Sequence, residues 1–311
     1  MPTVFVEGVA DPDRRDRIRA VPGVRVEFFD DHDELERRIA EADAVAGRVG
    51  AEALARATRL RWLQLWTAGP DAALFPEMIA SDVVLTSCAG NGAVPLAEHA
   101  MWFMLTLNRD ALRWVHAQEV HRWERHTHGE LNGLTLGIVG LGHSGADLAQ
   151  KAKAFHMHVL GLRRSDRPAE HVDELLAPDR LHELLARSDF VVVTAPLTPE
   201  TRGMFGEAEF RAMKRTAFFV VFSRGGIADD AALLRALDEG WIAGAGLDNF
   251  GTEPLPADSP FWTARHTICT PHNGATTEGT LRRGAEILVE NLGRFARGEE
   301  LVNIVDKNAG Y

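Results

Sequence analysis

A glycine-rich turn in the middle of the chain has the spacing of a phosphate-binding loop. The turn reads Gly140-Leu141-Gly142-His143-Ser144-Gly145. It follows a strand-like apolar run, 135–139, and precedes a helix-like run, 146–155. Glycine permits the tight turn at the first position, lets a pyrophosphate approach the backbone at the second, and allows close helix packing at the third. Because the helix would then offer free N–H groups to the phosphates, the pattern predicts a dinucleotide site.

The residues after the next apolar run, 158–162, bear on which dinucleotide is bound. A site for NAD usually has Asp or Glu about 20 residues beyond the glycines, where the carboxylate holds the ribose hydroxyls. This chain has Arg163, Arg164 and Ser165 there instead. An arginine fork matches the geometry of a phosphate, and the serine adds a hydroxyl donor. The sequence therefore predicts that NADP(H) is the preferred cofactor and NAD(H) a second one.

Three further polar segments stand where strand-like runs end. They are 222–226, 248–254 and 270–274. In an open α/β sheet, ligands bind outside the carboxyl ends of the strands, so these segments should face the same place as the glycine turn. Arg224 could grip a carboxylate, His272 could donate a proton to a carbonyl oxygen, and Glu253 could fix the tautomer of that imidazole and favour its charged form. Beside a nicotinamide, this set suits the reduction of a 2-keto acid.

Strand and helix signals alternate along both halves of the chain. Strands are expected at 1–6, 24–29, 43–47, 63–66, 83–86, 135–139, 158–162, 190–194, 217–222, 243–248 and 267–270. Helices are expected between them, among others at 33–41, 51–58 and 229–239. Such alternation indicates parallel sheets with crossover helices. We therefore expect an α/β fold of two doubly wound parallel-sheet domains, Rossmann-like or flavodoxin-like, around a cleft.

The order of these signals predicts a discontinuous first domain. Residues 1–94 and 281–311 should form a substrate-binding domain, and residues 95–280 a dinucleotide-binding Rossmann domain. A helix is expected from Thr277 to about Arg297. The tail that follows should return to the first domain, where 301–305 could form a final strand.

A long helix is expected to connect the two domains, from Pro95 to about Trp123. Its apolar residues recur mainly at three- and four-residue steps, and proline is tolerated in the first turn. At 1.5 Å per residue the helix would be ~40 Å long. We expect part of it to pack in the core and part to pair with a second copy of the chain, which predicts a homodimer.

Several motifs, in the same order along nearly the whole chain, resemble those of the D-2-hydroxyacid dehydrogenase family. The matching stretches are 136–145, 188–198, 223–229, 247–254 with Ser259-Pro260, and 270–276. The resemblance implies NAD(P)-dependent hydride transfer between a small 2-keto acid and a D-2-hydroxy acid. It implies that Arg224, Glu253 and His272 are catalytic, as in glyoxylate/hydroxypyruvate reductases.

The resemblance also implies binding residues. The loop 67–71 should grip the substrate carboxylate through backbone N–H groups at Ala68 and Gly69, with Arg224 and His272 completing the substrate site. Asp248 should contact the nicotinamide carboxamide. The implied cofactor-binding residues are Gly140, Gly142, His143, Ser144, Gly145, Arg163, Arg164, Ser165, Ala195, Pro196, Phe222, Ser223, Asp248 and Gly274.

Three residues depart from the family pattern and bear on the choice of substrate. Pro70 lacks an N–H in the carboxylate loop, Val221 stands where Asn is common, and Asn273 replaces an apolar residue beside the histidine.

An alternative function on the same fold is a non-catalytic NAD(P)(H)-sensing protein or corepressor-like regulator. Oxidation of an unusual anion such as phosphite is a third.

Composition argues against several other classes of protein. The net charge of −11 over 311 residues does not suit a nucleic-acid or anionic-membrane partner, since both attract basic surfaces. Cys88 and Cys269 have no metal-type spacing, so no metal site is expected. No signal peptide or membrane span is indicated, and we expect a cytoplasmic protein.

Overall fold

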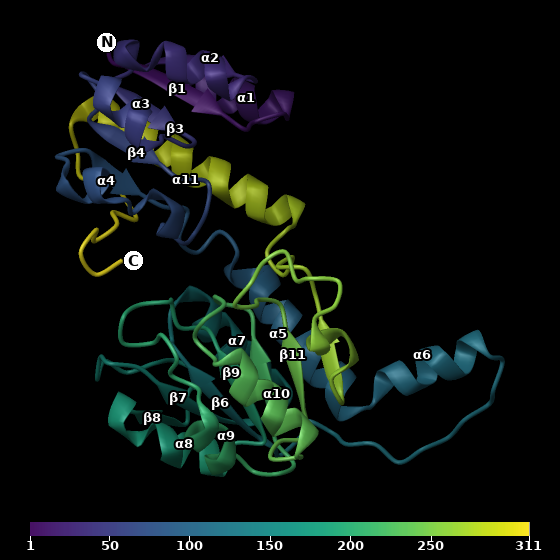
Figure 1. The fold of residues 1–311 in the computed structure, drawn as a ribbon. Coiled ribbons are helices and arrows are strands. Elements are labelled where there is room, and N and C mark those ends of the chain that lie inside the picture. Colours follow the sequence, from purple (N-terminus) through teal and green to yellow (C-terminus); the bar gives the residue numbers. More distant parts are fainter. Residues whose placement is uncertain (311) are drawn as a thin grey trace. The chain divides into compact units, whose positions relative to one another are not determined.

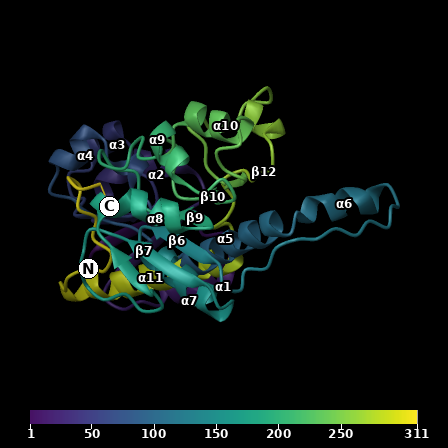
Figure 2. The same ribbon diagram turned by 90° about the horizontal axis from the view of Figure 1, so that it is seen from below.

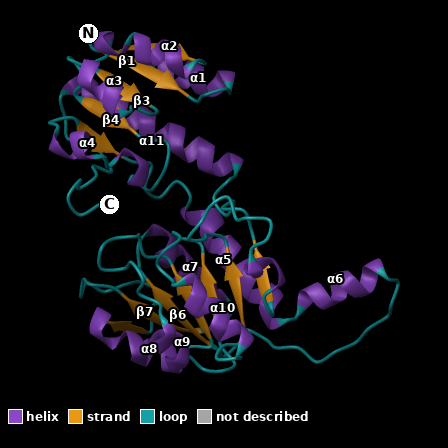
Figure 3. Cartoon of the chain, in the orientation of Figure 1, coloured by secondary structure: helices purple, strands orange, loops and turns teal. Residues whose placement is uncertain are grey.

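The computed structural model describes residues 1–310 and divides into two compact α/β units, each built on a parallel sheet (Figures 1 and 3). The first unit contains residues 1–92 together with the chain from residue 277 onward, and the second contains residues 93–276. The predicted fold class of two parallel-sheet α/β domains is confirmed.

The first unit has a five-stranded sheet in the order β2-β1-β3-β4-β5, which is the flavodoxin-like order. Its strands are β1 (Thr3–Glu7), β2 (Arg25–Phe29), β3 (Ala44–Ala46), β4 (Trp62–Gln64) and β5 (Val84–Thr86). Its helices are α1 (Pro12–Arg19), α2 (His32–Arg37), α3 (Ala51–Arg56), α4 (Pro76–Ala80) and α11 (Glu278–Arg297). Val4 packs with Leu288 of α11, whereas Phe5 packs with Leu35 of α2. Both faces of the sheet are therefore covered, which explains the continuous apolar runs.

The tail does not form the strand predicted at 301–305. A single antiparallel bridge joins Ile304 to Thr86 of β5, flanked by hydrogen bonds from Val305 N–H to Leu85 O and from Ser87 N–H to Asn303 O. Asn303 has a φ of 57°, in the left-handed region, so the backbone cannot continue an extended ladder there.

A buried polar network attaches α11 and the tail to this sheet. The fully buried Asn291 donates from Nδ2 to Gln64 Oε1 (2.9 Å) and to Val302 O (3.1 Å), and its Oδ1 accepts from Val302 N–H (2.8 Å). Gln64 Oε1 also accepts from Thr86 Oγ1 (2.9 Å). The side chain of Asn291 thus satisfies both polar groups of Val302 inside the protein.

Replacing Asn291 with Ala should destabilise the protein by about 2–3 kcal/mol, because the N–H and C=O of Val302 would lose their buried partners. Denaturant unfolding would measure the change. The matched substitution Asn308→Ala, at an exposed position of the tail, should cost less than about 0.5 kcal/mol. Equal effects of the two substitutions would show that the network does not hold the tail.

The second unit has a seven-stranded parallel sheet in the order β12-β11-β10-β9-β6-β7-β8, the Rossmann-type arrangement extended by one strand. The strands are β6 (Thr135–Val139), β7 (His158–Leu162), β8 (Glu174–Leu176), β9 (Phe190–Val193), β10 (Phe218–Val221), β11 (Gly244–Leu247) and β12 (Thr267–Cys269). From β6 onward the helices of this unit are α7 (His143–Ala154), α8 (Leu181–Arg187), α9 (Glu207–Ala212) and α10 (Asp230–Asp238). Short 3₁₀ turns lie at 39–41, 71–73, 178–180 and 260–263.

The prediction of one long helix over 95–123 was wrong. The structure has two helices, α5 (Ala93–Asn108) and α6 (Ala111–Glu119). Between them Asp110 adopts a left-handed conformation (φ 48°, ψ 44°), which ends the first helix. Asp tolerates this conformation better than most residues. α5 is buried against α7 and the sheet, whereas α6 and the segment after it project from the second unit (Figure 2).

Candidate functional site

The polar segments singled out in the sequence follow neighbouring strands of the seven-stranded sheet. Across the sheet from β12 to β9, the segments that follow successive strands carry His272, Glu253, Arg224 and Ala195 in turn. The glycine turn after β6 and the arginines after β7 continue the series. All these strands are parallel, so the segments share one edge. The chain changes direction across the sheet between β6 and β9, the kind of place where α/β proteins bind ligands.

His272 and Glu253 form a hydrogen-bonded pair on this edge. His272 Nδ1 lies 2.7 Å from Glu253 Oε2, and Glu253 Oε1 accepts from Phe250 N–H at 3.0 Å. Partial burial opposes ionisation of Glu253, but these hydrogen bonds and the nearby imidazole outweigh it and keep the pKa of this carboxyl below its usual range. The His272 side chain remains 49% exposed, so its second ring nitrogen can reach a ligand.

Asp248 holds the loop that carries His272. This carboxylate is only 1% exposed and accepts hydrogen bonds from Thr270 Oγ1 (2.6 Å), Asn273 N–H (2.9 Å) and Gly274 N–H (3.0 Å). Its bonds on both sides of His272 restrain the backbone there, where φ is 51°. Asp248 thus has a structural part in the site in addition to the cofactor contact expected from the sequence.

His99 of α5 is a residue of this site that the sequence analysis missed. Its Nε2 lies 3.0 Å from Thr270 Oγ1 and 3.7 Å from Asp248 Oδ1. Burial lowers the pKa of His99, and the Asp248 charge only partly opposes this. The only sequence signal for His99 was its position in an apolar helix, four residues before Phe103, which lies on the buried face of that helix.

The loop that carries Arg224 packs tightly on the loop that carries Glu253. A Cβ on Gly225 would lie 1.8 Å from Phe250 O, so only glycine fits between the two loops. Arg224 donates from Nη1 to Ser223 O at 2.7 Å and is partly exposed. The buried Oγ of Ser223 lacks a hydrogen-bond partner within residues 1–310, and the buried amide of Asn249 has only a weak interaction, with Glu253. Such unsatisfied groups suit a site that receives polar atoms of a ligand.

The glycine turn has the space that a dinucleotide requires. Gly140 has a φ of 102°, and a Cβ there would lie 2.6 Å from Ala195 N; a Cβ on Gly145 would lie 2.2 Å from Gly140 O. In contrast, a Cβ on Gly142 would meet no atom within 4 Å in the described chain. Gly142 is the N-cap residue of α7 and has no side chain that could cap the helix. The open backbone and uncapped N–H groups fit a pyrophosphate, with His143 and Ser144 in the first turn.

The two arginines after β7 are placed differently. Arg163 donates from Nε to Ser165 O (3.0 Å) and from Nη2 to Pro168 O (3.3 Å), so it holds its own loop together. Arg164 and Ser165 are exposed. The charge of Arg164 helps to lower the pKa of Glu200, after a larger contribution from a hydrogen bond with Thr198.

The predicted substrate loop lies in the first unit, after β4. Thr67 Oγ1 donates to Gly69 O at 2.7 Å, and Thr67 O accepts from Cys88 N–H at 2.9 Å. Ala68 is exposed, Gly69 partly so, and Pro70 is buried. These bonds fold the loop and leave residues 68–69 at its surface.

No group of three or more His, Cys, Asp or Glu side chains is arranged to hold a metal ion within residues 1–310. None of the helices described is long and apolar enough to cross a membrane.

Comparisons with known proteins match the chain over almost its whole length. The sequence model for the "D-isomer specific 2-hydroxyacid dehydrogenase, NAD binding domain" matches residues 101–274. A glyoxylate reductase of Korarchaeum cryptofilum is 35% identical over 283 residues, covering 87% of this chain and 84% of that protein.

Solved structures agree with this match. A D-isomer specific 2-hydroxyacid dehydrogenase family protein of Aeromonas salmonicida is 31% identical, with a TM-score of 0.90 over 98% of this chain and 99% of that one. The NADPH-dependent glyoxylate/hydroxypyruvate reductase of Sinorhizobium meliloti, solved with NADP and sulfate, is 31% identical with a TM-score of 0.87 over all of both chains.

Proposed function

The chain belongs to the D-isomer specific 2-hydroxyacid dehydrogenase family, NAD(P)-dependent oxidoreductases, and on this premise we propose how its own residues carry the reaction. Hydride transfer connects a small 2-keto acid with the corresponding D-2-hydroxy acid. We assign substrate binding to the first unit and dinucleotide binding to the second. The pair formed by His272 and Glu253, with Arg224 beside it on the next strand end, is the observation that supports this most strongly.

His272 is the proton donor in the direction of reduction. Because Nδ1 is engaged by Glu253, Nε2 is the nitrogen that can give a proton to the carbonyl oxygen. The carboxylate of Glu253 orients the ring and stabilises its charged form. When bound, the nicotinamide supplies the hydride to the keto carbon. The oxygen thus gains a proton and the carbon a hydride, which yields the alcohol.

Arg224 and the loop 67–71 hold the acid. The guanidinium of Arg224 suits two parallel hydrogen bonds to a carboxylate and also polarises the adjacent carbonyl. The backbone of the exposed Ala68 and the partly exposed Gly69 offers further N–H donors. Pro70 has no N–H, so this loop has one donor fewer than it would with another residue at that position.

We assign recognition of NADP(H) to the loop after β7, with Arg164 rather than Arg163 facing the phosphate of the ribose. Replacing Arg164 with Ser should reduce the ratio of kcat/KM for NADPH to that for NADH by about tenfold or more, since a charge-assisted phosphate contact contributes ~1.5–3 kcal/mol. The Arg163→Ser variant is the matched control. It should weaken both cofactors similarly, because Arg163 braces the loop. A wild-type preference for NADH would contradict the assignment.

A spectrophotometric screen tests the proposed reaction. Oxidation of NADPH and NADH is followed with glyoxylate, hydroxypyruvate, pyruvate and bulkier keto acids, and the reverse reaction with D- and L-2-hydroxy acids. We expect turnover of keto acids and use of the D-isomers only. Tight cofactor binding without turnover of any acceptor would instead indicate a cofactor-sensing protein.

We also propose that the chain forms a homodimer through α6 and the segment that follows it. Leu112, Val115, Val120 and Trp123 are exposed there, and Trp123 is 94% exposed. A projecting arm with exposed apolar side chains suits burial against a second copy.

The Val115→Asp variant should therefore sediment as a monomer, whereas the wild-type chain should sediment as a dimer. Unchanged circular dichroism would show that the variant still folds. A monomeric wild-type chain, or a variant that remains dimeric, would exclude this interface.

A further inference from the structure

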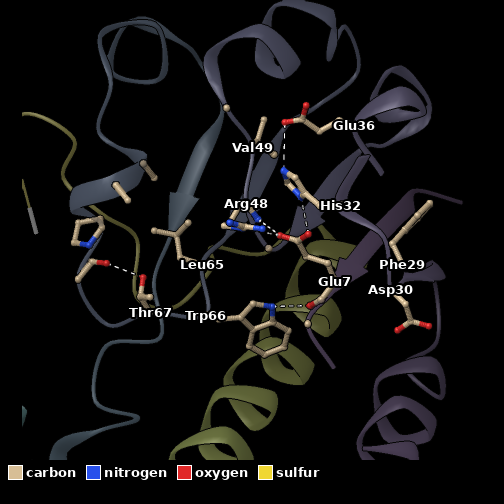
Figure 4. A pocket seen from close by; sticks show the side chains of 17 residues that line it. Glu7, Phe29, Asp30, His32, Glu36, Arg48, Val49, Leu65, Trp66 and Thr67 are labelled. Carbon is tan, nitrogen blue, oxygen red and sulfur yellow. Dashed lines mark hydrogen bonds and ion pairs between the residues drawn. The ribbon is translucent and has the colours of Figure 1, made fainter. Parts of the chain in front are cut away.

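A large cavity in the first unit lies beside the proposed carboxylate loop (Figure 4). Its volume is about 660 Å³, within the range of small-molecule sites. Residues following four parallel strands line it, and Thr67, Gly69 and Pro70 belong both to its wall and to that loop. A two-carbon acid such as glyoxylate has no atoms beyond its keto carbon to place in such a space.

The interior of the cavity is organised by Glu7, at the end of β1. Glu7 Oε1 accepts from the backbone N–H of Arg48 at 2.7 Å, and Glu7 Oε2 lies 2.7 Å from His32 Nδ1 (Figure 4). A Cβ on Gly47 would lie 2.2 Å from Glu7 Cγ, so a glycine is required for Glu7 to reach this position. The carboxylate of Glu7 therefore serves to fix the backbone that presents Arg48.

The other two carboxylates of the cavity also have histidine or arginine partners. Glu36 lies 3.4 Å from His32 Nε2 and 3.9 Å from an Arg56 nitrogen, and Asp30 pairs with Arg15. Each acidic side chain is thus compensated within the first unit. A cation entering the cavity would have to displace one of these partners.

Arg48 is held much more loosely. Its closest ion-pair approach to Glu7 is 3.6 Å from Nε, longer than a hydrogen bond, and 78% of its side chain is exposed. The guanidinium therefore keeps donors that can turn to an anion in the cavity. An arginine at this wall can bind a carboxylate or a phosphate by two parallel hydrogen bonds.

We propose that Arg48 is a specificity-determining residue that selects 2-keto acids with a second anionic group, a carboxylate or a phosphate, at the end remote from the keto acid. The inference rests on the proposed function. The substrate carboxylate is bound by the loop 67–71, and the rest of the molecule extends along Trp66 and Leu65 toward Arg48.

The Arg48→Gln variant tests this proposal by comparing kcat/KM among acceptors. For oxaloacetate, 2-oxoglutarate and 3-phosphohydroxypyruvate we expect a fall of about tenfold or more, since one lost charge-assisted contact corresponds to at least a factor of ten. For glyoxylate and hydroxypyruvate we expect a change of less than about twofold. The best of the three doubly anionic acceptors distinguishes a carboxylate site from a phosphate site. The matched variant is Arg37→Gln, at an exposed position outside the cavity. Its kcat/KM should equal that of the wild type for every acceptor.

A binding measurement makes the test independent of turnover. D-Malate should raise the Tm of the wild-type chain by more than it raises the Tm of Arg48→Gln. D-Lactate, which has a single carboxylate, should change the Tm of both proteins equally. Equal losses for all acceptors, no loss for any, or a preference for a keto acid with a basic end would overturn the role of Arg48. If the wild-type chain reduces no keto acid at all, the proposed function itself fails. If it reduces glyoxylate but the Arg48→Gln ratios are unchanged, only this inference fails.

Discussion

Replacing His272 with Gln should lower kcat for keto-acid reduction by about 10²–10⁴-fold, the usual contribution of a positioned general acid. Gln is similar in size but cannot deliver a proton, whereas the contacts of the glycine turn are unaffected. The dissociation constant of NADPH, measured by fluorescence titration, should therefore stay within about twofold. Single-turnover kinetics would locate the loss in the chemical step. Retention of wild-type kcat would exclude His272 as the proton donor.

Glu253→Gln is the companion variant and adds a dependence on pH. The pKa of Glu253 lies below its usual value, so the carboxylate of the folded protein stays charged until the pH falls through that lowered pKa. The stabilisation that it contributes is complete above the pKa of an unfolded Glu and is lost in acid. Gln removes this charge at every pH and, with it, the stabilisation of the protonated imidazole. As the pH is raised, reduction by Glu253→Gln should therefore decline at a lower pH than reduction by the wild type. An unchanged pH profile would mean that Glu253 does not support the imidazolium.

Replacing Gly142 with Asp should weaken dinucleotide binding by roughly 100-fold, because like charges brought together cost several kcal/mol. The substitution places a carboxylate where the pyrophosphate is expected. Yet the fold should tolerate it. Gly142 has extended backbone angles (φ −78°, ψ −161°) at the start of α7, where Asp is a favoured cap, and a Cβ there meets no described atom within 4 Å. Calorimetric titration with NADPH and a thermal melt would measure both properties.

Gly145→Ala is the contrasting control for that experiment. Its Cβ would lie 2.2 Å from Gly140 O, so this variant should lose stability as well as affinity. If Gly142→Asp binds NADPH like the wild type, the pyrophosphate does not lie at this turn. If Gly142→Asp unfolds, the protein has no room for a side chain at position 142.

Local sequence was sufficient to predict most of the fold and to select the candidate catalytic residues. Continuous apolar runs such as Phe190–Val193 read as strands because both faces of a parallel sheet are covered, and the glycine turn could be read from spacing alone. Arg224, Glu253 and His272 could be selected because each follows such a run. The prediction that the middle of the chain binds a dinucleotide needed no contact between distant residues.

Other features depend on contacts between residues far apart in the sequence. The network around Asn291, the role of Asp248 in bracing the His272 loop, and the approach of His99 to Thr270 join segments separated by 25 to more than 200 residues. Periodicity carries no information about such pairs. The break at Asp110 was missed for a related reason, since a repeating apolar pattern does not report the backbone angle of one residue.

The amino-acid sequence by itself thus determined the class of fold, the glycine turn and the chemical types of the candidate groups at the strand ends, because these follow from local patterns of apolar, glycine and polar residues. Only the tertiary structure decided which ring nitrogen of His272 is engaged by Glu253, which arginine braces its own loop, and that Arg48 lines a cavity beside the loop 67–71. Those properties depend on hydrogen-bond partners and open space, and both arise only when the strands come together.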